Sequence, residues 1–326
     1  MPAAFVTGGS GFVGTALIRR LAADGWTVRA LARSPEAEAK VRRAGAEAVR
    51  GDLLDAGALE RGARGAGVAF HSAARLGDFG PWKEFRRVNV DGTKAVIAAC
   101  RAAGVQRLVH VGTEAALMHG QPLVAVDEHY PLALRSRAPY SATKAAAEAA
   151  VIEANGNGLE TVVVRPRFVW GAGDTTLLPI LVAMARSGRL RWVGGGRQLT
   201  STTHVANTVE GLVLGAEKGL PGNAYFVTDG SPVVFREFVS TLLATQGVQA
   251  PEGEVPLPVA RAAARVSETL WRVLPLPGEP PVASFAVWAS GLEATIDDTK
   301  AREQLGYRPV MTRDHGLTAM QAVVVH

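Results

Sequence analysis

Three glycines near the N-terminus constrain the fold more than any other feature of this chain. Residues 7–14 read TGGSGFVG, which places Gly8, Gly11 and Gly14 at intervals of three residues. The apolar run 3–7 before them predicts a short strand, and the periodicity of residues 11–23 predicts a helix. In such a strand–turn–helix unit the backbone amides and the helix N-terminus bind a pyrophosphate, so we predict a dinucleotide site that includes Phe12 and Val13. A glycine-rich turn without a ligand is the alternative.

The alternation of strands and helices continues through the first half of the chain. Strands are predicted over residues 28–31, 46–50, 68–72, 107–111 and 161–164, with helices around Leu59 and over 84–103 and 140–155. This order implies right-handed crossovers between parallel strands. After Pro166 the pattern changes to helices over 177–187, 205–218, 236–245 and 259–273, with one strand over 224–227.

These elements predict an α/β protein with a Rossmann-type, doubly wound parallel sheet and a smaller C-terminal substrate lobe. We expect residues 1–170 to form the dinucleotide-binding domain and residues 171–326 to form mainly the substrate lobe. The segment 200–230 is expected to return to the Rossmann core. A chain of 326 residues is long enough for both parts.

Composition and charge narrow the range of partners. The net charge is +5, but the basic residues are scattered and only 6% of residues are aromatic, so we expect no nucleic-acid surface. No apolar run approaches the ~20 residues of a membrane span. A strand begins almost at Met1, which leaves no room for a signal peptide, and the single Cys100 cannot form an internal disulfide. We therefore expect a cytoplasmic protein, and the spacing of the histidines predicts no metal site.

The end of the second predicted strand bears on the identity of the cofactor. Residues 30–34 read ALARS, which offers Arg33 and no carboxylate. A carboxylate here would bind the free ribose of NAD(H), whereas an arginine binds the 2′-phosphate of NADP(H). The sequence therefore favours NADP(H), with NAD(H) and a merely solvated Arg33 as the alternatives. After the third strand, Asp52 is placed to accept a hydrogen bond from the adenine amino group and Leu53 to pack on the ring.

A tyrosine and a lysine stand four residues apart in the predicted helix 140–155. The segment 140–144 reads YSATK, so Tyr140 and Lys144 share one face of that helix. The ordinary pKa of tyrosine is about 10, and a nearby ammonium is expected to lower it. Tyr140 could then exchange a proton with a carbonyl or alcohol oxygen while a hydride moves. The same spacing also occurs in ordinary helices, so the pair needs support from other motifs.

Taken together, the motifs resemble the extended short-chain dehydrogenase/reductase family, also called the NAD(P)-dependent epimerase/dehydratase family, over nearly the whole chain. They are most like its 3β-hydroxysteroid dehydrogenase and dihydroflavonol reductase branch. The matching segments are TGGSGFVG at 7–14, GDLLD at 51–55, HSAA at 71–74, NVDGT at 89–93, HVGTEA at 110–115, YSATK at 140–144, RPRFVWG at 165–171, HVANT at 204–208 and DDTKAREQLGYRP at 297–309.

The resemblance implies roles for individual residues. It makes Tyr140 the general acid/base, Lys144 the residue that binds the nicotinamide ribose, and Thr113 a hydrogen-bond partner of the substrate oxygen. It also implies that the cofactor is lined by Ala73, Ala74 and Pro166. His204 and Asn89 match family positions that we interpret as structural.

The family contains epimerases, dehydratases and reductases, and two positions bear on this choice. Its sugar-nucleotide dehydratases carry an acidic pair after the threonine, whereas here Glu114 is followed by Ala115. Its sugar-nucleotide epimerases often carry an arginine four residues before the histidine of the HVANT segment, where it pairs with a substrate phosphate. Here that position is Thr200, although Arg197 lies nearby in the sequence and could take the place of the arginine. The first departure removes the second carboxylate that elimination of water needs, although Glu114 could substitute one position off. The second favours a substrate without phosphate charge.

We therefore predict an NADP(H)-dependent oxidoreductase that interconverts a ketone and a secondary alcohol on an apolar, small-molecule substrate. The substrate classes that the resemblance suggests are sterol-like, flavonoid-like and long-chain β-keto compounds. Apolar residues of the C-terminal part would form a lid, or else pack in the core: Leu270, Trp271, Phe285 and Trp288. The alternatives are a nucleotide-sugar epimerase/dehydratase and a non-catalytic NAD(P)-binding sensor or scaffold. A homodimer through helices that include 140–155 is a family-level expectation.

Overall fold

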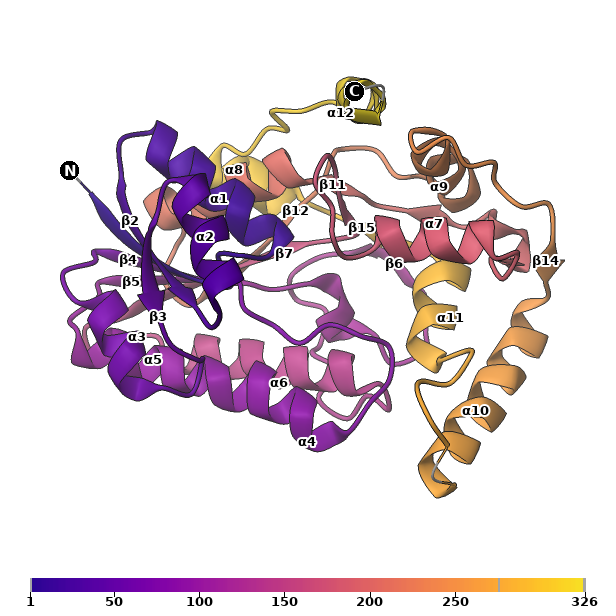
Figure 1. Ribbon diagram of the computed structural model, residues 1–326, viewed down its shortest axis with the longest axis horizontal. Coiled ribbons are helices and arrows are strands. Elements are labelled where there is room, and N and C mark those ends of the chain that lie inside the picture. The colour runs from indigo at the N-terminus through magenta and orange to yellow at the C-terminus, as the bar shows by residue number, and fades with distance from the viewer. Residues whose placement is uncertain (1, 275, 325–326) are drawn as a thin grey trace.

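The computed structural model describes residues 2–274 and 276–324, and its centre is a parallel sheet of seven strands (Figure 1). The strand order is β12-β7-β5-β4-β1-β2-β3, and all neighbouring strands are parallel. The chain order reverses between β1 and β4, which is where a doubly wound sheet binds its ligands. The predicted fold class is thereby confirmed. The strands are β1 (Ala3–Thr7), β2 (Thr27–Ala32), β3 (Glu47–Arg50), β4 (Val68–His71), β5 (Arg107–Val111), β7 (Glu160–Pro166) and β12 (Asn223–Val227).

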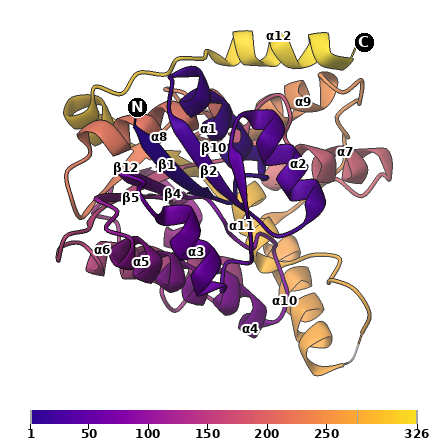
Figure 2. The same ribbon diagram turned by 60° about the vertical axis from the view of Figure 1, so that its left-hand side comes forward.

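Helices cover both faces of this sheet (Figures 1 and 2). On one face the core includes Leu17 and Ile18 of α1 together with Leu212 of α8. On the other face the core includes Leu59 of α3 and Val96 of α5. The first face carries α1 (Phe12–Ala23), α2 (Pro35–Ala44) and α8 (Val205–Lys218), and the second carries α3 (Ala56–Ala63), α5 (Gly92–Ala102) and α6 (Pro139–Glu153).

A smaller lobe lies beside the carboxyl ends of the strands, on the right in Figure 1. Its sheet of four strands has the order β13-β10-β15-β6, and two short parallel pairs, β8–β11 and β9–β14, accompany it. The strands are β6 (Leu123–Val126), β8 (Val169–Trp170), β9 (Trp192–Val193), β10 (Leu199–Thr200), β11 (Thr203–His204), β13 (Val233–Val234), β14 (Glu254–Val255) and β15 (Ala294–Ile296). The helices are α7 (Leu178–Arg186), α9 (Phe235–Ala244), α10 (Leu257–Val273) and α11 (Ser284–Gly291), and α12 (Arg313–Val324) ends the chain.

The two parts are interleaved in sequence. Strand β6 comes from the first half of the chain but lies in the sheet of the lobe, whereas α8 and β12 come from the second half and belong to the main sheet and its core. Tyr307, close to the C-terminus, is also buried in that core. Among residues 2–274 and 276–324, no helix has the length and apolarity that a membrane crossing would require.

One helix differs from its prediction. Instead of a single α-helix over 84–103, the chain forms α4 (Trp82–Phe85), a π-helical turn η1 (Arg86–Asp91) and α5 in succession. A π-turn takes up an additional residue, and η1 includes the buried Asn89. Asn89 Oδ1 accepts a hydrogen bond from the Arg75 backbone N at 2.7 Å, and its Nδ2 donates to Thr143 Oγ1 at 3.1 Å. Asn89 therefore ties the loop after β4 to α6.

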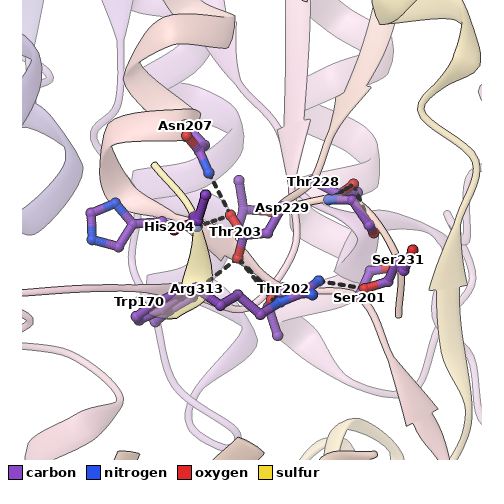
Figure 3. A network of polar contacts seen from close by, with 12 residues as sticks. Trp170, Ser201, Thr202, Thr203, His204, Asn207, Thr228, Asp229, Ser231 and Arg313 are labelled. Carbon is purple, nitrogen blue, oxygen red and sulfur yellow. Dashed lines mark hydrogen bonds and ion pairs between the residues drawn. The ribbon is translucent and has the colours of Figure 1, made fainter. Parts of the chain in front are cut away.

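A buried carboxylate fastens the C-terminal segment to the rest of the fold (Figure 3). Asp229 follows β12, and its oxygens accept four hydrogen bonds of 2.6–2.8 Å, from Trp170 Nε1, Thr202 Oγ1, His204 N and Asn207 Nδ2. Arg313, at the start of α12, lies 3.9 Å from the same carboxylate. His204 precedes α8, and its Nδ1 accepts a hydrogen bond from Ala206 N at 3.2 Å. This contact gives His204 the structural role that the sequence suggested.

Candidate active site

A cavity of about 1300 Å³ lies between the carboxyl ends of the parallel strands and the smaller lobe. It runs from the glycine turn after β1 to the helices α7, α9 and α11. Gly14 does not line it but is buried behind the turn. All the other residues that the sequence nominated for cofactor binding or chemistry line this one cavity: Gly8, Gly11, Phe12, Val13, Arg33, Asp52, Leu53, Ala73, Ala74, Thr113, Tyr140, Lys144 and Pro166.

The glycine turn fits a pyrophosphate. A Cβ on Gly8 would lie 2.5 Å from Ala73 N, and one on Gly14 would lie 2.2 Å from Gly8 O, so these two glycines allow the chain to pack on itself. A Cβ on Gly11 would meet only Gly8 O, at 3.2 Å, and would otherwise project into open space. Gly11 is the residue that precedes α1, and no side chain caps this helix. The first amides of α1 are therefore available to an anion at the place where a methyl group on Gly11 would intrude.

The turns after β2 and β3 lie at the same end of the cavity. Arg33 is exposed and lines the cavity, whereas Ser34 caps α2 by accepting a hydrogen bond from Ala37 N at 3.2 Å. Asp52 Oδ1 accepts a hydrogen bond from Leu54 N at 3.1 Å, which closes the turn after β3. Leu53 packs on Gly92 at the start of α5 and also lines the cavity. Arg33 is thus an exposed cation at this end of the cavity.

Lys144 is held in a buried position below the cavity. Its side chain is 4% exposed, its Nζ donates to Val111 O at 2.8 Å, and His110 Nε2 lies 3.2 Å away. Burial lowers the pKa of Lys144 to about 8. Burial and the charge of Lys144 hold the pKa of His110 well below its usual range, so His110 is neutral at pH 7 and its Nε2 accepts from the ammonium. The strand β5 therefore fixes the direction of the lysine.

Tyr140 faces the cavity one helical turn before Lys144. Its ring contacts the edge of Phe285 with centroids 5.4 Å apart. Burial raises the pKa of Tyr140 above its ordinary value, the negative charge of Glu114 raises it further, and contact with the Thr113 hydroxyl lowers it. The expectation that Lys144 lowers this pKa is therefore wrong for the protein without cofactor, because the ammonium is directed at Val111 and His110 instead. Tyr140 is a protonated phenol at neutral pH.

A buried ion pair next to Thr113 was not predicted from the sequence. Thr113 Oγ1 donates to Glu114 Oε2 at 2.8 Å, and Glu114 Oε1 pairs with Arg167 Nη1. Arg167 Nε also donates to Thr200 Oγ1 at 3.1 Å. An arginine therefore does reach the position that Thr200 marks, although it comes from the link between β7 and β8. The idea that Arg197 takes that place is wrong, because Arg197 lies against Gly195 and does not line the cavity.

The wall opposite the strands is apolar, but not through the residues that the sequence suggested. Of the expected lid, only Phe285 lines the cavity, while Trp288 packs in a core with Leu117 and Leu123, and Leu270 is exposed. The wall is formed instead by side chains of α7, α9 and β9 and of the segment before β9: Leu177, Ile180, Leu181, Met184, Leu190, Trp192, Val193, Phe235 and Val239. The apolar end of the cavity is thus built by α7, α9 and β9 together with α11 and the segment before it.

Several known proteins are similar in sequence to this chain over most of its length. The sequence model of the 3-beta hydroxysteroid dehydrogenase/isomerase family matches residues 5–259. The chain belongs to this family. Among relatives, a 4-hydroxy-2-methyl-3-oxo-4-farnesyl-3,4-dihydroquinoline-1-oxide ketoreductase of Stigmatella aurantiaca is 50% identical over 97% of this chain and 95% of its own. A 2-alkyl-3-oxoalkanoate reductase of Stenotrophomonas maltophilia is 38% identical over 97% of this chain and 98% of its own.

Solved structures share the fold of this family member. The crystal structure of gox2253 superposes with a TM-score of 0.80 and 26% identity, covering 99% of this chain and 98% of that one. The dTDP-glucose 4,6-dehydratase DesIV of Streptomyces venezuelae, solved with NAD and TYD, superposes with a TM-score of 0.77 and 24% identity, covering 98% and 96%. The second likeness concerns the fold alone.

Membership of the 3-beta hydroxysteroid dehydrogenase/isomerase family confirms two predictions. The chain is an enzyme, an NAD(P)-dependent oxidoreductase of the extended short-chain dehydrogenase/reductase type, and its fold is that of the family. The cavity joins the glycine turn to Thr113, Tyr140 and Lys144.

Proposed function

We propose that the protein interconverts a ketone and a secondary alcohol on an apolar substrate with NADP(H) as its cofactor and Tyr140 as general acid/base. One observation carries this proposal: a single cavity connects the glycine turn, the Tyr140–Thr113 pair and the apolar wall of α7 and α9. A cofactor at the turn and a substrate at the wall would then meet beside Tyr140. This arrangement favours hydride transfer coupled to proton transfer.

The residues of the chain suggest how the cofactor would be held. The amides after Gly11 would bind the pyrophosphate, Arg33 the 2′-phosphate and Lys144 the nicotinamide ribose, with the adenine beside Asp52 and Leu53. Ala73, Ala74 and Pro166 would line the remaining length of the cofactor. When bound, the nicotinamide supplies or accepts the hydride. This assignment is supported by the fit of the turn, since only a small residue at position 11 keeps that space open.

Tyr140 is placed to act as the acid when a ketone is reduced. A phenol with a raised pKa keeps its proton at neutral pH, so Tyr140 can donate that proton from Oη to the carbonyl oxygen as the hydride arrives at carbon. Thr113 contacts Tyr140, its hydroxyl donates to Glu114, and its oxygen accepts from Ala115 N at 3.2 Å. The second lone pair of this oxygen can accept a hydrogen bond from the newly formed alcohol. The same groups run the oxidation in reverse.

The apolar wall supports long, poorly charged substrates. The relatives from Stigmatella and Stenotrophomonas are named for a farnesyl-bearing ketone and for an alkyl-substituted 3-oxoalkanoate. Both names combine a ketone with a flexible apolar chain, which the cavity can enclose along α7 and α9. We therefore favour ketones with a long alkyl or prenyl chain over compact sterol-like or flavonoid-like ones.

A panel of ketones followed at the NADPH absorbance tests the proposed function. Long-chain β-keto, aryl and sterol ketones are offered to the purified protein, with NADPH and NADH in parallel. We expect turnover of the long-chain ketones with NADPH. Turnover of none of them, together with a thermal shift in the presence of UDP- or dTDP-sugars, would instead identify a nucleotide-sugar enzyme. Cofactor binding with no turnover of any compound would favour a sensor or scaffold.

A further inference from the structure

Arg167 is a buried arginine, and one of its nitrogens, Nη2, has no hydrogen-bond partner among the described residues. It is 2% exposed, and its backbone N donates to Thr203 Oγ1 at 3.1 Å, which fixes the chain between β7 and β8. Nε donates to Thr200 and Nη1 pairs with Glu114. Nη2, in contrast, makes no hydrogen bond to any residue of 2–274 or 276–324. A guanidinium has five N–H donors in a fixed planar arrangement, and buried donors are normally hydrogen-bonded. A buried nitrogen without a partner in the protein therefore suggests that it binds a ligand.

The free side of the fork faces the cavity. Arg167 is among the residues that line it, together with Thr113, Glu114 and Tyr140. The other arginines that line the cavity are exposed at its rim: Arg33, Arg87, Arg189 and Arg191. Arg167 is thus the buried cation of this set, and a ligand that reaches Tyr140 also comes close to it.

The position of Arg167 relative to the reacting group follows from two contacts. Thr113 Oγ1 touches Glu114 Oε2 at 2.8 Å, and the other oxygen of the same carboxylate holds Arg167 Nη1. The guanidinium is therefore separated from the threonine beside Tyr140 by one carboxylate group. A group that hydrogen-bonds to Nη2 lies near the carbonyl at Tyr140, but not on the same oxygen.

We propose that Arg167 Nη2 binds a second oxygen atom of the substrate, so that the enzyme selects ketones that carry another oxygen function close to the reacting carbonyl. β-Keto acids, β-keto esters and α-hydroxy ketones belong to this class. This inference rests on the proposed function. Because Glu114 already neutralises the guanidinium and only one edge of the fork is free, the site suits a single acceptor oxygen and not a phosphate dianion.

The wild type tests the proposal first. We compare kcat/KM for a long-chain β-keto ester with that for a plain ketone of equal length, in which methylenes replace both the carbonyl and the oxygen of the ester group. A hydrogen bond from a charged, buried donor predicts a preference of about 10- to 100-fold for the β-keto ester. Equal values for the two compounds would overturn the inference and leave the proposed function standing. Turnover of neither compound would overturn both.

Two variants then assign the preference to Arg167. Glu114→Gln keeps the arginine, so we expect the ratio of the two kcat/KM values to persist. The double variant Glu114→Gln, Arg167→Met removes both charges, and we expect it to bring this ratio close to one. Arg167→Lys retains the ion pair but lacks the planar guanidinium, so we expect it to lose most of the preference for the β-keto ester. This variant tests the assignment even if the double variant does not fold. A ratio that survives in the Arg167 variants would overturn the assignment, because a merely structural role changes both substrates alike.

Discussion

At the scale of single residues, Lys144 has a measurable thermodynamic signature. Burial places its pKa at about 8 in the folded protein, against an ordinary value of 10.5. Between these two values the unfolded chain holds the proton and the folded chain does not. The unfolded state therefore binds more protons in this window, and the contribution of Lys144 to the free energy of unfolding increases as the pH rises through it. Below pH 8 both states are protonated and the contribution is constant.

This linkage predicts a difference between the wild type and Lys144→Met. We expect the unfolding free energy of the wild type to increase relative to that of the variant by about 1–2 kcal/mol between pH 8 and pH 10, since one pKa unit corresponds to about 1.4 kcal/mol. Urea denaturation of both proteins without cofactor, from pH 6 to pH 10, measures it. A difference that stays constant across this range, or that moves the other way, contradicts the burial of a lysine with a lowered pKa.

We expect Arg33 to discriminate between the two nicotinamide cofactors. It is exposed at the rim of the cavity, so its removal is expected to leave the fold intact. Arg33→Ala should weaken the binding of NADPH by about tenfold or more, because a charge-assisted bond to phosphate is lost, and should change NADH binding little. Fluorescence titration of both cofactors measures these affinities. An equal effect on the two would mean that Arg33 does not read the 2′-phosphate.

The ion pair between Glu114 and Arg167 could not be predicted from the sequence. The two residues are 53 positions apart, and each stands inside a motif that was recognised for a different residue. They meet because β5 and β7 are neighbours in the sheet, so that the segments following them lie side by side. The charges could be read from the sequence, but their pairing depends on strand order and on the path of the chain after each strand.

At the scale of elements, the turn before α1 contains two glycines with different roles: Gly14 allows close packing, and we expect Gly11 to leave room for the cofactor. Gly14→Ala places a methyl group 2.2 Å from Gly8 O, so we expect a loss of roughly 1–3 kcal/mol in unfolding free energy from overpacking. Gly11→Ala meets only Gly8 O at 3.2 Å, so its stability should fall by no more than about 1 kcal/mol. Its methyl group nevertheless enters the space that the pyrophosphate would fill.

The two substitutions are therefore a matched pair. Gly11→Ala is expected to weaken NADPH binding at least tenfold while it unfolds at nearly the urea concentration of the wild type, and Gly14→Ala is expected to unfold early. Denaturation and cofactor titration on both proteins measure the two effects. Wild-type affinity in Gly11→Ala would show that no ligand occupies that space.

The elements differ in how far their sequences specify them. The strand β1 follows from its continuous apolar run, and the helix α1 follows from its periodicity, because Leu17, Ile18 and Leu21 are buried on one face. The π-turn η1 does not, since it depends on Asn89 finding partners in the loop after β4 and in α6. The sequence did not show which apolar residues face the cavity: Leu270 of α10 is exposed, whereas Trp192 of β9 lines the cavity.

At the scale of the whole molecule, function depends on the interleaving of the two parts. The C-terminal half contributes β12 to the main sheet, and Asp229, directly after β12, fastens β8, β11 and the start of α12 around one carboxylate (Figure 3). The lobe that carries the apolar wall is therefore held against the sheet that carries the glycine turn. This arrangement brings residues between positions 8 and 290 of the chain to one cavity.

The central claim is that Tyr140 transfers the proton in that cavity. Tyr140→Phe removes the phenolic hydroxyl and keeps the ring that contacts Phe285, so the fold and the cofactor turn should be unaffected. The decisive measurement is single-turnover oxidation of NADPH by this variant with a ketone that the wild type reduces, alongside NADPH titration. We predict that NADPH binds with wild-type affinity and that the rate of turnover falls by at least about 100-fold. Turnover at the wild-type rate would contradict the account.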